Sequence, residues 1–263
     1  MVSKQGSTEK LARKLDWEKS IIDTLGDADK CVRCYKEVAS TMSVARELAV
    51  PDKAVIILAE NQTAGVGRRG QPWETTPGSL FATIGFKVDK DQDCSLMPLA
   101  AGVAILKVLD IAPGELYLKW PNDIYTPSGR KIGGILIEKY KKILAIGIGL
   151  NLQAAPKDLG ADSVSSAVGR TCSPPELISH LFPLLQSMLY NSQKAELLDI
   201  LNEWKVYSYS YGTEMTGIVD GKEIIGRYQG VDETGRIKIE QEVSGMKIIS
   251  TFSTFEIKSL KLG

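Results

Sequence analysis

Metal-binding and redox-active residues are scarce in this sequence of 263 residues. It has one histidine, His180, and four cysteines, at Cys31, Cys34, Cys94 and Cys172. Because a zinc site needs several Cys or His ligands at short spacing, these scattered residues do not predict one. The spacing Cys31-Val-Arg-Cys34 is that of a redox pair, but it leads into an extended segment. We therefore expect reduced structural thiols and a reducing compartment.

Long apolar runs and an excess of one charge are also absent. No apolar run approaches about 18 residues, and residues 1–6 lack the apolar core of a signal peptide, so we expect no membrane contact. Glu9, Asp16 and Glu18 argue against an organellar transit peptide, and we expect a cytoplasmic protein. Lys plus Arg and Asp plus Glu each total 32, so no overall positive field favours nucleic acid, and we expect no DNA partner.

Glycine and arginine, by contrast, gather in the stretch 60–73. This stretch lies between two apolar runs, 54–59 and 79–86, which predict two strands joined by a loop. Glycine allows positive φ and close backbone approach to a ligand, and the forked arginine side chain suits carboxylate or phosphate. The loop residues with these properties are Gly65, Gly67, Gly70, Arg68 and Arg69. The stretch predicts an anion-binding loop, although a solvated hairpin with two surface arginines stays open on these residues alone.

Two hydroxyl side chains, Ser40 and Thr41, precede a run of good helix formers at 43–49. Either residue is typical of a helix N-cap. Alternatively, the hydroxyls and the first free N–H groups of the helix hold the polar end of a ligand.

Residues 116–125 predict a strand that breaks at Pro121. Proline has no N–H to donate to a strand ladder, so the pairing ends there. The break leaves the polar side chains of Asn122 and Asp123 available for other partners.

The next two apolar runs, 131–138 and 143–151, predict a hairpin that is rich in glycine. Its glycines are Gly133, Gly134, Gly147 and Gly149. Glycine weakens a strand, so a bulge, a tight bend or a ligand lying flat on the sheet is the usual explanation. Lys131 begins the first run, either as a solvated strand end or as a charged group beside that ligand.

Helices are predicted in the chain before, between and after these strands. Residues 1–30 hold one amphipathic helix that ends near Gly26. A winged-helix DNA-binding domain would need about twice that length, because its recognition helix requires a supporting one. Further helices are predicted at 96–109, 175–190 and 194–206. His180 lies in the second of these, where a packed or capping role is expected.

From about residue 208 the pattern changes to short strands separated by turn dipeptides, Asp220-Gly221, Thr234-Gly235 and Ser244-Gly245. Four to five such strands predict a small β-barrel. The expected fold class is therefore α+β, with an N-terminal helical extension at 1–30, a main domain at 31–207 and the small barrel at 208–263.

Four motifs, taken in their order along the chain, carry a resemblance to a known family. They are Gln-Thr-Ala-Gly-Val-Gly-Arg-Arg-Gly at 62–70, Lys-Trp-Pro-Asn-Asp at 119–123, Lys-Ile-Gly-Gly-Ile-Leu at 131–136 and Gly-Ile-Gly-Leu-Asn at 147–151. Together they resemble the biotin protein ligases, from roughly residue 31 to the C-terminus. The resemblance implies a class II synthetase-like catalytic domain, in which helices pack on a mixed or antiparallel sheet. It also implies that biotin is activated with ATP and Mg²⁺ to biotinyl-5′-AMP and then joined to a lysine of a biotin carboxyl carrier protein.

The resemblance also assigns residues to these roles. The catalytic residues are Lys131, Arg68 and Asp123. The biotin-binding residues are Ser40, Thr41, Met42, Gln62, Gly65, Val66, Gly67, Arg68, Lys131, Gly133 and Gly134. The residues at ATP and the adenylate are Arg68, Arg69, Trp73, Asn122, Lys131 and Asn151. No residue is assigned directly to a metal, since Mg²⁺ enters with ATP, and Asp123 is the one carboxylate considered for it.

The sequence departs from the family pattern at two positions. Val66 stands where the family commonly has a second arginine, and Met42 stands where an asparagine usually follows the hydroxyl pair. In the family a basic residue of the C-terminal barrel points to ATP, and here both Lys258 and Lys261 fit. A lipoate or octanoate ligase of the same fold and a biotin-responsive regulatory protein are the alternatives. A homodimer also stays open.

Overall fold

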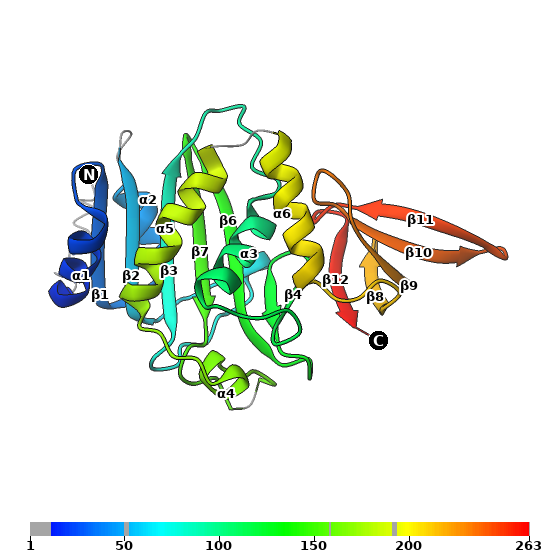
Figure 1. The fold of residues 1–263 in the computed structure, drawn as a ribbon, viewed down its shortest axis with the longest axis horizontal. Helices are drawn as coiled ribbons and strands as arrows, with labels where there is room; N and C mark the ends of the chain where they lie inside the picture. Colours follow the sequence, from blue (N-terminus) through cyan, green and yellow to red (C-terminus); the bar gives the residue numbers. More distant parts are fainter. Residues whose placement is uncertain (1–11, 50–52, 158, 191–193, 263) are drawn as a thin grey trace, which may run out of the picture. The chain divides into compact units, whose positions relative to one another are not determined.

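The structure is a computed structural model that describes residues 12–49, 53–157, 159–190 and 194–262 (Figure 1). The start of the predicted N-terminal extension thus lies outside the described residues. The helices are α1 (Leu15–Leu25), α2 (Thr41–Glu47), α3 (Met97–Val108), α4 (Val164–Val168), α5 (Pro174–Tyr190) and α6 (Lys194–Tyr207), with a short 3₁₀ helix, η1, at Arg68–Gly70. The helices predicted near the N-terminus and at 96–109, 175–190 and 194–206 are confirmed as α1, α3, α5 and α6.

Seven strands form the main sheet in the order β1-β2-β3-β7-β6-β5-β4. They are β1 (Lys30–Val38), β2 (Ala54–Gln62), β3 (Leu80–Lys87), β4 (Tyr117–Lys119), β5 (Asp123–Tyr125), β6 (Lys131–Tyr140) and β7 (Ile143–Leu150). The β1–β2 pair is parallel, whereas β2–β3, β3–β7, β4–β5 and β5–β6 are antiparallel. Every residue of β3 except its last is buried, as expected for a continuous apolar run with both faces covered.

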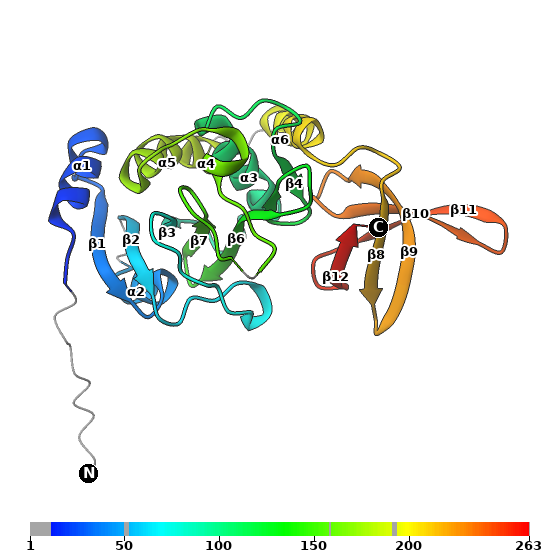
Figure 2. The same ribbon diagram turned by 90° about the horizontal axis from the view of Figure 1, so that it is seen from below.

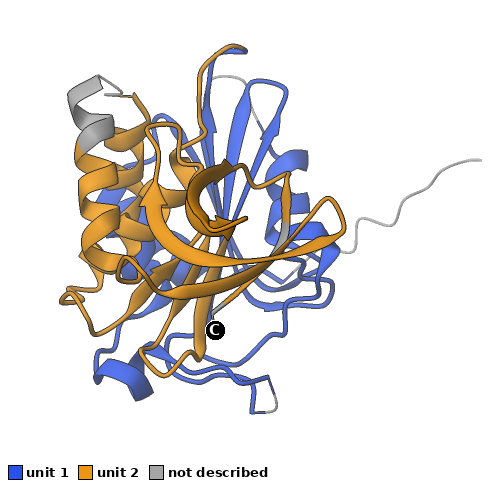
Figure 3. Ribbon diagram, turned by 90° about the vertical axis from the view of Figure 1, so that its right-hand side faces the viewer, with its two compact units in different colours: residues 1–90, 136–180 blue, residues 91–135, 181–263 orange. Residues whose placement is uncertain are grey.

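The chain folds as two compact units (Figure 3). Unit 1 comprises residues 1–90 and 136–180, and unit 2 comprises residues 91–135 and 181–263. The domain boundaries expected from the sequence, at about 30 and 207, stay a prediction.

In unit 1, α2 lies on one face of the strands, and the beginning of α5 lies on the opposite face (Figure 2). Apolar side chains of α2 and of the strands β1 and β2 form a buried cluster between these elements. The cluster consists of Tyr35, Val38, Val44, Ala45, Val55, Ile57 and Ala59. It fixes the short helix α2 against the sheet, and with it the backbone around Thr41.

In unit 2, α3 and α6 pack together, and five strands form a second, antiparallel sheet in the order β11-β10-β9-β8-β12. These strands are β8 (Glu214–Val219), β9 (Lys222–Val231), β10 (Ile237–Val243), β11 (Met246–Phe252) and β12 (Ile257–Leu262). The predicted turn dipeptides connect β8 to β9, β9 to β10 and β10 to β11. Asp220 and Gly221 have φ of 48° and 78°, the positive values that a two-residue hairpin turn requires.

The predicted α+β class, with helices on a mixed sheet and a smaller C-terminal β structure, is confirmed. The predicted break at Pro121 is confirmed, but Asp123 is the first residue of β5 rather than part of the break, and β4 and β5 pair with each other as an antiparallel hairpin. The peptide bond before Pro121 is cis. The Ser163 hydroxyl caps α4 by accepting from Ser166 N at 3.2 Å.

Candidate functional site

A buried chain of neutral hydrogen bonds joins α2, β2 and β3 in unit 1. The Thr83 hydroxyl donates to Thr41 Oγ1 at 2.9 Å, and the Thr41 hydroxyl donates to Gln62 Oε1 at 3.2 Å. Gln62 Oε1 also accepts from the backbone N–H of Thr41 at 2.8 Å. Thr41 is 3% exposed and Thr83 is fully buried. Gln62 therefore takes the place of a capping side chain, and Ser40, at the N-cap position, makes no capping hydrogen bond.

Thr83 was not among the residues predicted for the site. Its signal in the sequence is a single polar residue within the apolar run of β3. A buried hydroxyl needs a hydrogen-bond partner, so an isolated threonine in such a run indicates a polar neighbour in space.

The glycine-arginine stretch folds back on itself as a narrow loop. Trp73 N donates to Gly65 O at 2.9 Å and Gly67 N donates to Gln71 O at 2.8 Å, with η1 at the tip. Arg69 adopts a left-handed conformation there, with φ of 59°. A side chain at Gly65 would crowd its neighbours, since an added Cβ would lie 3.0 Å from Gln62 Nε2 and 3.2 Å from Trp73 O.

The other loop residues differ in exposure. Arg68 and Gly67 are half-buried, whereas Arg69 is exposed, and Val66 keeps 47% of its surface exposed. Val66 pairs with Pro72 through an isolated β-bridge. The residue that replaces the family's second arginine therefore points an apolar side chain partly into solvent.

The glycines of β7 contact side chains of unit 1 itself. A Cβ added at Gly149 would lie 2.6 Å from Trp73 Cε2, and one added at Gly147 would lie 3.1 Å from Met42 Sδ. Gly149 is thus needed for the close approach of Trp73 from the end of the loop, and Gly147 leaves little room beside Met42 of α2. Met42 is 6% exposed, so this departure from the family pattern packs against the sheet.

Asn151 directly follows β7 and is 4% exposed. Its Nδ2 donates to Asp162 O at 3.1 Å, and its carbonyl oxygen accepts from Val164 N at 2.8 Å. Asn151 therefore holds the backbone that leads into α4. Its predicted role at the adenine ring stays a prediction.

In unit 2, two of the predicted site residues, Lys131 and Asp123, form an ion pair. Lys131 Nζ lies 2.8 Å from Asp123 Oδ1, and their side chains are 33% and 23% exposed. The two residues come from neighbouring strands, in which Asp123 faces Gly134 and Ile124 faces Gly133. Gly134 therefore places no side chain beside the Asp123 carboxylate.

Asn122 supports the turn that carries this ion pair. Its Nδ2 donates to Ile135 O at 2.6 Å, and its carbonyl oxygen accepts from Ile135 N at 2.9 Å. Asn122 N also donates to Lys119 O at 3.1 Å. In the structure Asn122 bonds backbone groups, and its predicted contact with the adenylate stays a prediction.

Lys119 is a charged neighbour of this ion pair that was not among the residues predicted for the site. It is the register partner of Asp123, and its Nζ lies 4.9 Å from the centre of the Tyr125 ring. Burial lowers the pKa of Lys119, Asp123 raises it, and the charges of Lys131 and Lys261 lower it further. Of the two basic residues expected to reach ATP from the C-terminal sheet, Lys261 thus acts electrostatically on this group, and the Lys258 side chain lies outside the described part of the structure.

Magnesium is the metal that the family resemblance implies. The described side chains offer it a single carboxylate rather than a complete set of ligands. Among the described residues, no cluster of three or more His, Cys, Asp or Glu side chains is arranged to hold a metal ion. Mg²⁺ commonly binds through one or two carboxylates together with substrate phosphates and water. Asp123 alone therefore fits a magnesium ion that arrives with a nucleotide.

The cysteines and the histidine take no part in either group. All four cysteines are free, as expected. Cys31 and Cys34 lie three positions apart on β1, so they point to opposite faces and cannot act as a redox pair. His180 is exposed on α5 rather than packed, and its Nδ1 lies 2.9 Å from Glu176 O. Within the part of the chain that the structure describes, no helix has the length and apolar character to span a membrane.

Comparison with known proteins identifies a family domain in this chain. Residues 36–153 match the model of the biotin/lipoate A/B protein ligase family. The biotin–[acetyl-CoA-carboxylase] ligase of Mycobacterium tuberculosis is 28% identical over 257 residues, which cover 92% of this chain and 95% of that protein. The bifunctional ligase/repressor BirA of Bacillus subtilis is 28% identical over 233 residues, which cover 82% of this chain and 71% of that protein.

A solved structure shows the same fold. The biotin protein ligase of Aquifex aeolicus, in complex with biotin and ATP, superposes with a TM-score of 0.72. The match covers 89% of this chain and 99% of that one, at 23% sequence identity.

Proposed function

We propose that this chain, whose residues 36–153 match the biotin/lipoate A/B protein ligase family, is a biotin protein ligase with two reaction steps. In the first step, a carboxylate oxygen of biotin attacks the α-phosphorus of ATP, and the bond to the β-phosphate oxygen breaks, which releases diphosphate. In the second step, the amine of a carrier-protein lysine attacks the carbonyl carbon of biotinyl-5′-AMP. An amide bond forms, the bond to AMP breaks, and the amine loses a proton.

The observation that carries the choice of biotin is the neutral hydrogen-bonded chain of Thr41, Gln62 and Thr83. The ureido ring of biotin offers one carbonyl oxygen and two N–H groups, all uncharged. Hydroxyl and amide side chains match such a group in polarity and size, and they are less costly to bury than charged ones. The relatives whose names specify biotin ligation support the same substrate.

We assign charge stabilisation in the first step to Lys131 and Arg68. Negative charge builds up on the phosphate oxygens during attack by a carboxylate, and fixed cationic donors lower the energy of that arrangement. Lys131 is held by Asp123 at 2.8 Å, so its ammonium group is already oriented. Magnesium bound with ATP would supply further positive charge to the phosphates, with Asp123 as the carboxylate that fits it.

We assign orientation of the incoming lysine amine to Asp123. This carboxylate is partly exposed, at 23% of its side chain, so a partner protein can reach it. The loop at 60–73 would cover the adenylate and exclude water, which otherwise hydrolyses the mixed anhydride. The partner in this proposal is the biotin carboxyl carrier domain of a biotin-dependent carboxylase.

Incubation of the protein with ATP, magnesium and biotin tests the proposal. Diphosphate release measures the first step, and labelling of an added carrier domain measures the second. Lipoate and octanoate are run in parallel, since ligases of these acids share the family. Turnover with lipoate or octanoate but not with biotin would overturn the choice of substrate, and no turnover with any of the three would overturn the proposed reaction.

A further inference from the structure

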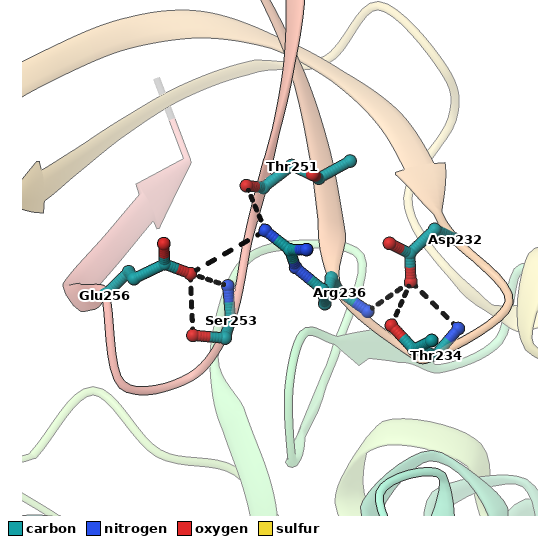
Figure 4. A network of polar contacts seen from close by, with 6 residues as sticks. All are labelled: Asp232, Thr234, Arg236, Thr251, Ser253 and Glu256. Atoms are coloured by element: carbon teal, nitrogen blue, oxygen red, sulfur yellow. Dashed lines mark hydrogen bonds and ion pairs between the residues drawn. The ribbon is translucent and has the colours of Figure 1, made fainter.

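The turn between β9 and β10, at residues 232–236, is built around one carboxylate. Asp232 Oδ1 accepts from Thr234 N at 2.9 Å, from Thr234 Oγ1 at 2.8 Å and from Arg236 N at 2.9 Å (Figure 4). Although burial alone would raise the pKa of Asp232, the hydrogen bonds from Arg236 and Thr234 lower it below its ordinary value. The turn thus has a fixed shape that a charged aspartate maintains.

Arg236 ties this turn to the end of β11. Its Nη2 donates to Thr251 O at 2.9 Å and lies 3.9 Å from Glu256 Oε2 (Figure 4). Glu256 in turn accepts from the N–H and from the hydroxyl of Ser253, both at 2.7 Å. The turn is therefore part of a polar network within the C-terminal sheet.

Gly235, at the tip of the turn, contacts the main part of unit 2. Its φ is +79°, and an added Cβ would lie 2.8 Å from Leu96 Cδ2 and 3.4 Å from Leu99 Cδ1. Its carbonyl oxygen accepts from Trp120 Nε1 at 2.9 Å. Trp120 is 4% exposed, so this hydrogen bond is the one through which its indole N–H is satisfied away from water.

Trp120 lies in the hairpin turn between β4 and β5, which also carries Asn122 and leads directly into Asp123, the first residue of β5. On one side, Asn122 bonds the backbone of Ile135 in β6. On the other side, Trp120 bonds Gly235. The turn that presents Asp123 to Lys131 is therefore fixed from two directions, and the second support comes from the C-terminal sheet.

We propose that the turn at 232–236 is a positioning element for the candidate catalytic turn, in which Gly235 O fixes the Trp120 indole and thereby the place of Asp123 beside Lys131. The inference rests on the proposed function for its consequence in catalysis. Gly235, Asp232 and Trp120 touch no reacting atom, so they act through Asp123. A purely structural role, in which the contact only adds stability to unit 2, is the competing explanation.

A pair of matched variants separates these explanations. Trp120→Phe keeps a buried aromatic ring but removes the N–H that bonds Gly235. Trp204→Phe makes the same change at the other buried tryptophan of unit 2, whose Nε1 donates to the Tyr228 hydroxyl at 3.3 Å. Trp204 is 1% exposed and lies on α6, outside the candidate catalytic turn.

Single-turnover transfer from biotinyl-5′-AMP to a carrier domain is the kinetic measurement. We expect Trp120→Phe to slow transfer by about tenfold, the typical effect of one lost hydrogen bond, with the KM for biotin within about twofold. Trp204→Phe should leave both values near those of the wild type. Equal transfer rates in the two variants would overturn the proposal. Asp232→Asn serves as a second variant, with the same direction of change expected at a smaller size.

Amide NMR spectra give a readout that does not depend on the reaction. In the ¹H–¹⁵N spectrum, Trp120→Phe should shift the resonances of Asn122, Asp123 and Lys131, and Trp204→Phe should not. Unshifted resonances in Trp120→Phe would overturn the positioning role even if the protein is a biotin ligase. Shifted resonances in a protein that forms no biotinyl-adenylate would leave the positioning role intact and overturn the proposed function instead.

Discussion

Thr41, Gln62 and Thr83 in unit 1 form a neutral hydrogen-bonded chain in which the two threonines are buried and Gln62 is half-buried, whereas Asp123 and Lys131 in unit 2 form an ion pair that stays partly exposed. The difference follows from the cost of burial, since uncharged groups with partners can be buried cheaply and charged groups cannot. It also suggests a division of roles. The neutral group suits recognition of an uncharged ring, and the charged group suits stabilisation of charge that develops during a reaction.

The largest expected effect tests the charged group. Lys131→Ala should slow adenylation by about 10- to 1000-fold, by analogy with the loss of one donor from an oxyanion site, with little change in the KM for biotin. Diphosphate release measures the rate, and circular dichroism confirms that the variant is folded. Lys222→Ala, on the exposed start of β9, is the matched control and should behave as the wild type. A Lys131→Ala rate close to that of the wild type would remove the catalytic assignment.

Arg68 belongs to unit 1, but its proposed role is the same as that of Lys131, to stabilise charge during adenylation. Its variant therefore tests whether charge stabilisation is confined to unit 2. Arg68→Ala should also slow adenylation by about 10- to 1000-fold, because a forked donor to carboxylate and phosphate is lost. Arg69→Ala, its exposed neighbour on η1, gives the comparison within the loop. An effect of Arg68→Ala only on the KM for biotin would place Arg68 with the recognition group.

A smaller effect, on the KM for biotin, is expected when the Thr41 hydroxyl of the neutral group is removed. The Thr41 hydroxyl links Thr83 to Gln62, and Thr41→Val removes it while keeping the shape of the side chain. Loss of a buried hydrogen-bond partner costs about 1–3 kcal/mol, so the KM for biotin should rise by about 5- to 150-fold, with kcat nearly unchanged. Thr41→Ser retains the hydroxyl and should restore most of the affinity. A fall in kcat with an unchanged KM would contradict the division of roles.

Much of the fold was predictable because it depends on local patterns. The apolar runs at 54–59, 79–86 and 143–151 gave the central strands, and Asp220-Gly221 gave a hairpin turn with the required positive φ. The loop at 60–73 was located from its glycines and from the strands on either side. Residues that are close together in the sequence are enough to determine these features.

The contacts that complete each group were not predictable, since they join residues far apart in the sequence. Nothing local to Gly149 indicates that Trp73 packs on it, and nothing local to Gly235 indicates that its carbonyl accepts from Trp120. The glycines of β7 were expected to bend the strand or face a ligand, but Met42 and Trp73 lie against them. Which side chain fills the space above a glycine depends on the tertiary fold.

The smallest expected effect concerns Val66, which is 47% exposed in the unit 1 loop that also carries Arg68 and Arg69. Val66→Arg adds a cation to unit 1 where the family commonly has one. The contrast between the neutral group of unit 1 and the charged group of unit 2 then becomes smaller. An exposed charge pair contributes about 0.2–1 kcal/mol, which corresponds to release of radiolabelled biotinyl-5′-AMP slowed by about 1.5- to 5-fold. Raised salt should weaken the effect, because exposed charges are screened. Val66→Gln, which is polar but uncharged, should leave release unchanged. Release that is equally slow in both variants would mean that the size of the side chain, not its charge, retains the adenylate.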